Sequence, residues 1–137
     1  MQAGDQEREI VRAFFVPEQR PRYLGLLSTA KGRKKFIARL AHSDLLDPRY
    51  VRRIDPREQT IDAIEDQLRE RGAPATCYVI SEDPRLDRQQ MTMRGALEAI
   101  VGSGMSTFLS CIVGRLAYFE GEEPGARYVC ERAASNR

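Results

Sequence analysis

The feature that most constrains the fold is a change in hydrophobic periodicity at Pro74. Before it, apolar residues recur at spacings of three and four, which is typical of helices that pack along one face. After it, short β-branched and aromatic runs are separated by turn residues, which predicts strands. Because helices and strands are segregated along the chain, we expect an α+β fold. In it, helices cover one face of a small mixed or antiparallel sheet.

The segment 1–72 is expected to form the helical part. At its start, Ile10 and Phe14 belong to one apolar stripe, with Glu7 placed off that stripe. Proline suits the first turn of a helix, so a second, short helix is expected from Pro21. The ranges with helical spacing are 6–16 and 30–41. Because glycine disfavours helix, a break is expected near Thr29 to Gly32.

The tripeptide Asp-Pro-Arg at 47–49 and again at 55–57 is read as a helix start. Aspartate caps free N–H groups, and proline fits the first turn, where its missing donor does no harm. We therefore expect a short helix over 48–53 and a longer one over 56–71, whose buried stripe is Ile61, Ile64 and Leu68.

The segment 73–132 is expected to form the α/β part, with about four strands in the order β-α-β-β-β. A polar loop up to Gln90 is expected to follow the first strand. The expected strands are 76–80, 105–112, 115–120 and 127–131, and the first of them is expected to be buried on both faces. The expected helix is 93–101, with Thr92 as its cap. No Gly/Ser-rich linker separates the two parts, so residues 1–137 are expected to form a single domain. Residues 133–137 are expected to be a frayed tail.

The basic residues are concentrated in one segment. Between residues 20 and 57 there are eleven Lys or Arg and three Asp, a net charge of +8 in a chain of net charge +2. On the expected helix over 30–41, four of these cations cluster on one side. The predicted basic patch consists of Lys31, Lys34, Lys35, Arg39, Arg49, Arg52 and Arg53.

Clustered Lys and Arg bind phosphate backbones and acidic protein surfaces. The chain has no zinc-finger spacing, no aromatic RNA-recognition motif and no helix-turn-helix pattern. We therefore expect a small non-catalytic binding or regulatory module whose basic surface, residues 20–57, engages an acidic partner, nucleic acid or protein. The alternative is a solvated surface whose charges pair with carboxylates elsewhere in the chain.

A small enzyme is the alternative function. His42 is the only histidine, and imidazole titrates near neutrality. Asp44 or Asp47 could orient it as a general base in a pocket between helices and sheet. No second catalytic group can be identified from the sequence.

Cysteine usage and hydropathy indicate the compartment. Cys77, Cys111 and Cys130 lie among apolar neighbours and form no C-x-x-C pair, as expected of reduced thiols in a cytoplasmic protein. Their spacing with His42 matches no zinc pattern, so neither a metal nor a cofactor is expected. No apolar run approaches the roughly 18 residues that span a bilayer, so no membrane contact is expected.

The expected last hairpin carries three aromatic residues, Tyr118, Phe119 and Tyr128. If they are exposed, they form a protein interface, and the second alternative is an oligomeric assembly or inhibitor subunit acting through this hairpin. If they are buried, they serve cross-strand packing. The last strand is expected to be a free edge, which allows a homodimer by strand pairing.

Overall fold

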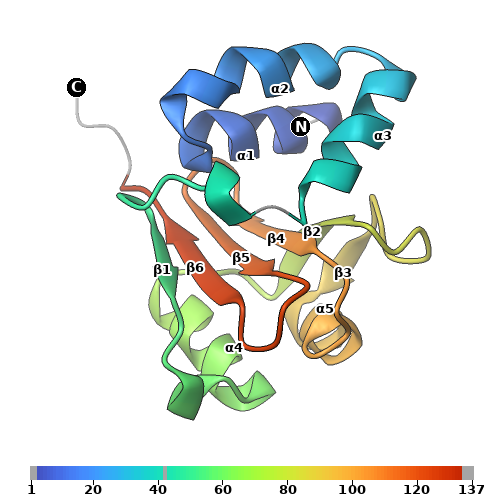
Figure 1. Ribbon diagram of the computed structural model, residues 1–137. Coiled ribbons are helices and arrows are strands. Elements are labelled where there is room, and N and C mark those ends of the chain that lie inside the picture. Colours follow the sequence, from blue (N-terminus) through green and yellow to red (C-terminus); the bar gives the residue numbers. More distant parts are fainter. Residues whose placement is uncertain (1–2, 42, 134–137) are drawn as a thin grey trace.

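The computed structural model describes residues 3–41 and 43–133, and in them an antiparallel sheet lies between two layers of helices (Figure 1). The six strands have the spatial order β1-β6-β5-β4-β2-β3. The strands are β1 (Val51–Arg53), β2 (Thr76–Ser81), β3 (Gln90–Thr92), β4 (Thr107–Ile112), β5 (Leu116–Glu120) and β6 (Arg127–Glu131). The α+β class is confirmed, but the described sheet has six strands rather than about four.

Three helices lie on one face of the sheet and two on the other (Figure 1). The first group is α1 (Ala3–Phe14), α2 (Arg20–Leu26) and α3 (Ala30–Arg39), and the second is α4 (Ile61–Glu70) and α5 (Met93–Ile100). Three 3-10 turns complete the described elements: η1 (Pro17–Gln19), η2 (Ser43–Leu45) and η3 (Pro56–Glu58). The expectation that helices cover one face of the sheet is therefore wrong.

Helices cover both faces because the central strands are apolar on both sides. Ile80 and Phe108 point to α1–α3, whereas Val79 and Leu109 point to α4 and α5. Successive strand residues point to opposite faces, so an uninterrupted apolar strand needs two apolar partners. The sequence predicts this double burial for the first strand, and β4 and β5 share it.

The expected helix over 48–53 is a strand instead. After a turn that ends at Tyr50, the chain enters β1, whose residues pair with β6 in the register Val51↔Cys130. The ladder partner lies about eighty residues further along the chain, so local propensity does not reveal it. As a consequence β6 has a neighbour on each side, and the expected free edge at the last strand is wrong: β1 and β3 are the edges.

The expected helix over 56–71 is divided in two. Asp55 caps the 3-10 turn η3, and Thr60 then caps α4 by accepting the N–H of Ala63 at 3.1 Å. The predicted apolar stripe is present, since Ile64 and Leu68 are fully buried. A second cap by Thr92 begins α5, as expected from the sequence.

The expected polar loop up to Gln90 ends in β3, which pairs with β2. Residues 134–137 of the expected tail lie outside the described residues. No helix in the described ranges has the length and apolar character needed to cross a bilayer.

Candidate functional site

The Asp-Pro-Arg tripeptides build a local ion pair. In each, the aspartate accepts the N–H of the arginine two residues later and also its guanidinium. The Nη2–Oδ2 distances are 2.8 Å for Arg49–Asp47 and 2.9 Å for Arg57–Asp55. A third copy, Asp83-Pro84-Arg85, forms the same arrangement in the loop after β2. Arg49 and Arg57 are therefore already paired, which removes two cations from the basic surface.

Arg33 is also neutralised, but by carboxylates distant in sequence. Its Nη1 donates to Asp87 Oδ2 at 2.8 Å and its Nε to Glu7 Oε2 at 2.8 Å, and its side chain is 12% exposed. Burial lowers the pKa of Arg33, but the hydrogen bonds to Asp87 and Glu7 outweigh it and raise the pKa above the ordinary value. This cluster joins α1 and α3 to the β2–β3 loop.

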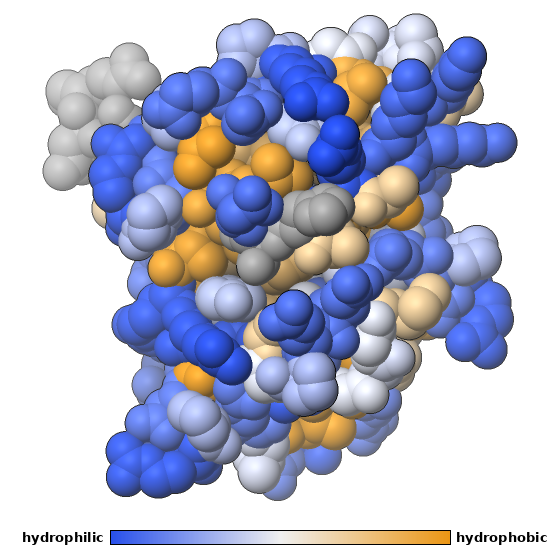
Figure 2. Space-filling view, viewed as in Figure 1, coloured by the Kyte–Doolittle hydropathy of each residue, from blue (hydrophilic) through white to orange (hydrophobic). Residues whose placement is uncertain are grey.

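The remaining cations of α3 face solvent. All four are exposed, and among the residues that the structure describes none of them forms an ion pair. Figure 2 shows long hydrophilic side chains projecting at the corner of the molecule where α3 lies. We call Lys31, Lys34, Lys35 and Arg39 the α3 cations.

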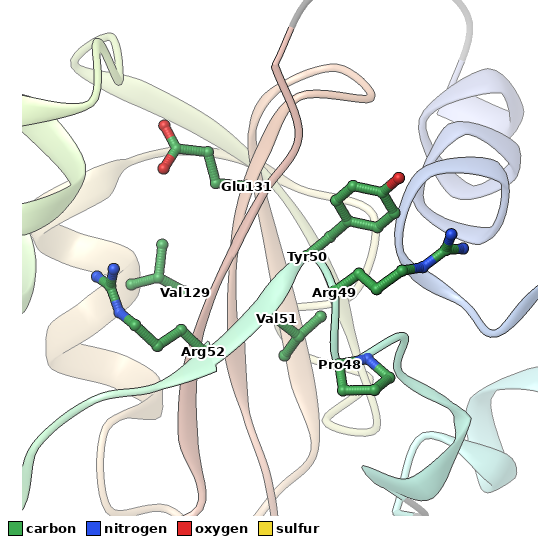
Figure 3. A pocket seen from close by; sticks show the side chains of 7 residues that line it. All are labelled: Pro48, Arg49, Tyr50, Val51, Arg52, Val129 and Glu131. Atoms are coloured by element: carbon green, nitrogen blue, oxygen red, sulfur yellow. The ribbon is translucent and has the colours of Figure 1, made fainter.

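The other predicted patch residues lie at the opposite end of the sheet. Arg49, Arg52 and Val51 line a shallow pocket of about 320 Å³ at the β1 edge. Figure 3 shows Arg49 and Arg52 pointing away from each other. Arg53 donates to the carbonyl of Gly125 at 3.1 Å. Because Arg33 places α3 beside the β2–β3 loop, the predicted patch is two separate groups rather than one track.

Asp47, one of the two predicted carboxylate partners of His42, is buried and already paired with arginine. It accepts from Arg49, and the Arg20 guanidinium lies 3.7 Å away. The hydrogen bond from Arg49 lowers the pKa of Asp47, although burial opposes the shift. A carboxylate held in its charged form by arginine is a weak base. His42 lies outside the described residues, and Asp44 is exposed.

The three cysteines are buried and free. Burial raises the pKa of Cys77 to about 11 and that of Cys111 to about 12, and it also raises the pKa of Cys130. Thiols with such pKa values are unreactive at neutral pH, because the thiolate is the nucleophile. Within the ranges 3–41 and 43–133, no group of three or more His, Cys, Asp or Glu is placed to hold a metal ion.

The aromatic residues of the last hairpin are mostly internal. Tyr118 and Phe119 are at most 1% exposed and belong to the two cores on opposite sheet faces. Tyr118 donates to the buried carboxylate of Glu120 at 2.5 Å. Only Tyr128 is partly accessible. The prediction that these three aromatic residues form a protein interface is therefore wrong, and they serve cross-strand packing instead.

One charged centre was missed by the sequence reasoning. Glu7 was expected off the apolar stripe, yet it is 4% exposed and lies under α3, paired with Arg33. A signal was available, because Glu7 is three and seven residues before Ile10 and Phe14 and so shares their face. No signal in the sequence shows that Arg33 and Asp87 are its neighbours.

Comparisons of the chain with protein-family models, with curated proteins and with solved structures found no match.

Proposed function

We propose that this protein is a small non-catalytic binding module in which the α3 cations engage an acidic partner, nucleic acid or protein. The observation that carries the proposal is their exposure without carboxylate partners among the described residues. The inward-facing cation of the same helix, Arg33, is by contrast matched by Glu7 and Asp87. On α3, the cation that serves the fold is thus paired, and the four that face solvent are available to a partner.

A polyanion suits the α3 cations better than a single carboxylate does. A single exposed ion pair contributes little, because solvent screens it and long side chains lose freedom. Several adjacent cations that meet a polyanion release condensed counterions, so binding strengthens with the number of contacts. Lys31, Lys34 and Lys35 lie within two turns of α3. They are therefore close enough together to contact one polyanion at the same time.

A salt series tests the proposal. Binding of the purified protein to fluorescent duplex DNA, single-stranded RNA and polyglutamate is measured by anisotropy at increasing salt. We expect affinity for at least one polyanion to fall steeply, with a slope of about 3 to 4 for four phosphate contacts in the case of nucleic acid. The three probes separate a nucleic-acid partner from an acidic protein.

Charge reversal locates the surface. The variant Lys34→Glu/Lys35→Glu is expected to lose affinity by about tenfold or more, with thermal stability near wild type. The matched control, Arg52→Glu/Arg115→Glu, makes the same change in charge at exposed positions on the β1 edge and the β4–β5 turn. Equal losses in both variants, or no salt-dependent binding, would contradict the proposal.

A further inference from the structure

The strand β1 forms one edge of the sheet. It pairs with β6 on one side, and no described strand pairs with its other side. Figure 1 shows β1 at the margin of the sheet, beside β6. An edge strand presents backbone N–H and C=O groups that can pair with another chain. The outer side of β1 therefore has the chemistry needed to accept a further strand.

The pairing with β6 determines which backbone groups of β1 face outward. The carbonyl of Tyr50 accepts an N–H of β6, and the N–H of Ile54 donates to a carbonyl of β6, both at 2.8 Å. In an antiparallel ladder, such residues alternate with residues whose N–H and C=O groups point away from the partner strand. The backbone of Arg52 is therefore directed at β6, whereas Val51 and Arg53 direct their backbone groups outward. In the described ranges, no hydrogen bond engages these four outward groups.

The pocket of about 320 Å³ at the β1 edge lies beside these groups. Val51 of β1 and Val129 of β6 contribute apolar lining, and Pro48 and Tyr50 extend it before the strand (Figure 3). When a strand is added to a sheet edge, backbone hydrogen bonds supply affinity, and pockets for alternate side chains supply specificity. The pocket therefore offers apolar contact to a side chain of an added strand.

The side chains of β1 favour an acidic partner. Arg52 and Arg53 are both exposed, and in the part of the chain that the structure describes neither pairs with a carboxylate. Arg53 instead donates to the carbonyl of Gly125. Residues directly opposite each other on neighbouring strands interact, so that opposite charges there stabilise the pair and like charges destabilise it. Acidic residues opposite the two arginines are therefore favoured, and β1 of a second copy is disfavoured.

Carboxylates beside α4 limit how acidic this partner is. Arg52 also lines a second pocket, together with Glu58, Asp66 and Glu70. Among the described residues, none of these three carboxylates forms an ion pair with Arg52. They repel a long run of negative charge such as a nucleic-acid backbone. A protein segment with two adjacent acidic residues instead concentrates its charge at the two arginines.

From these observations we propose that β1 accepts an extended segment of a partner protein as a further antiparallel strand. The segment carries two adjacent acidic residues opposite Arg53 and Arg52, followed by an apolar residue opposite Val51. The antiparallel direction continues that of all described strand pairs. This surface is distinct from the α3 cations, and it recognises an extended protein segment rather than a polyanion.

A short peptide tests the proposal. The probe is fluorescein-labelled Thr-Val-Glu-Glu-Val-Thr, and its binding to the full chain is measured by anisotropy. Saturable binding is expected. Replacement of Glu-Glu by Lys-Lys is expected to weaken binding about tenfold or more, because two favourable cross-strand charge pairs become unfavourable.

Methylation of peptide nitrogens tests the backbone pairing with the protein unaltered. In the proposed register, the first glutamate and the valine that follows the second glutamate donate their N–H groups to β1. Methylation of these two nitrogens is expected to weaken binding about tenfold or more. The matched control methylates the second glutamate and the valine before the first one. Their N–H groups point away from β1, so binding is expected to be unchanged.

Hydrogen exchange measured by NMR locates the contact. In the free protein, the amides of Val51 and Arg53 are expected to exchange faster than that of Arg52, and bound peptide is expected to slow them about tenfold or more. The variant Arg52→Glu/Arg53→Glu is expected to lose peptide affinity about tenfold or more. The matched control Lys34→Glu/Lys35→Glu is expected to retain it while losing polyanion binding.

Three results would overturn the inference. These are no saturable binding of the acidic peptide, equal binding of the two methylated peptides, or no added protection of the Val51 and Arg53 amides. Protection of both amides in free protein that light scattering shows to be dimeric would also overturn it, because a second copy would then occupy the edge. None of these results bears on polyanion binding by the α3 cations, so the two proposals fail separately.

Discussion

At the level of single residues, the role of each arginine depends on where its nearest carboxylate lies. Arg49, Arg57 and Arg85 pair with an aspartate two residues earlier, and this arrangement is local enough to be recognised in the sequence. Arg33 pairs with Glu7 and Asp87, which only the folded chain brings near it. A count of charges in residues 20–57 therefore overstates the positive charge available to a partner.

These pairs predict how acid affects stability. The arginine hydrogen bonds lower the pKa of Asp47, Asp55 and Asp83 from 3.8. A carboxyl with a lowered pKa stabilises the fold above its unfolded pKa, and this contribution is lost as pH falls through the lower folded pKa. Stability should therefore be level near neutrality and fall below about pH 4.

The variant Asp47→Asn isolates the most buried of the three aspartates. It should be less stable at pH 7 by about 1 kcal/mol, after allowance for the partly exposed Arg49 partner. It should also lose less stability than wild type between pH 5 and pH 2, as measured by urea unfolding. The control Asp44→Asn changes an exposed carboxylate. A variant that lost as much stability in acid as wild type would show that this pairing is not what acid removes.

At the level of elements, two helical glycines differ in their surroundings. A Cβ at Gly32, in the first turn of α3, would overlap the backbone of Leu26, so its absence lets α2 and α3 approach closely. A Cβ at Gly25, in α2, would meet no atom within 4 Å. The low helix propensity of glycine predicts a helix break near Thr29 to Gly32. The chain does break there, since Thr29 is the extended N-cap of α3, but Gly32 itself lies within α3 and allows close packing.

A pair of substitutions tests this distinction. Gly25→Ala should stabilise the protein by about 0.5–1 kcal/mol, because alanine favours helix and nothing obstructs it. Gly32→Ala should destabilise it by about 1–3 kcal/mol, because the Leu26 backbone must shift. Thermal and urea unfolding of both variants measures the difference. Equal effects would mean that the approach of α2 to α3 is not tight.

The strand β1 shows the limit of local patterns at this level. Asp47-Pro48-Arg49 and Asp55-Pro56-Arg57 form the same ion pair, yet a strand follows the first and a 3-10 turn includes the second. The difference arises because Val51–Arg53 pair with the backbone of β6 as an antiparallel strand. Hydrogen bonds to a distant strand outweigh a helix-start signal, because the signal contributes only about 1 kcal/mol.

At the level of the whole molecule, the sheet ends in β1 and β3 rather than in β6. The β1 edge carries Arg52 and Arg53, both exposed. Charged side chains on an edge strand oppose pairing with a second copy of the chain. A homodimer formed through the last strand, as the sequence suggested, would first require removal of β1.

The two arginines on the edge strand β1 are expected to prevent self-association. The variant Arg52→Thr/Arg53→Thr should associate at concentrations where wild type is monomeric, because threonine favours strand pairing and the charges are removed. Light scattering over a concentration series measures the mass. The control Arg39→Thr/Arg115→Thr removes two exposed cations away from the edge. Wild type that dimerises as readily as the edge variant would show that the arginines do not protect β1.

The sequence by itself determined the α+β class, the cap at Thr92 and the burial of the first strand on both faces, because these depend on periodicity and on neighbours within a few residues. Tertiary structure alone decided that helices cover both faces, that β1 pairs with β6, and that Glu7, Arg33 and Asp87 meet. These outcomes depend on contacts between residues far apart in the chain, and no local pattern encodes which distant partner a strand or a charge will find. For the same reason the basic segment was visible in the sequence, but its division into paired and solvent-facing cations was not.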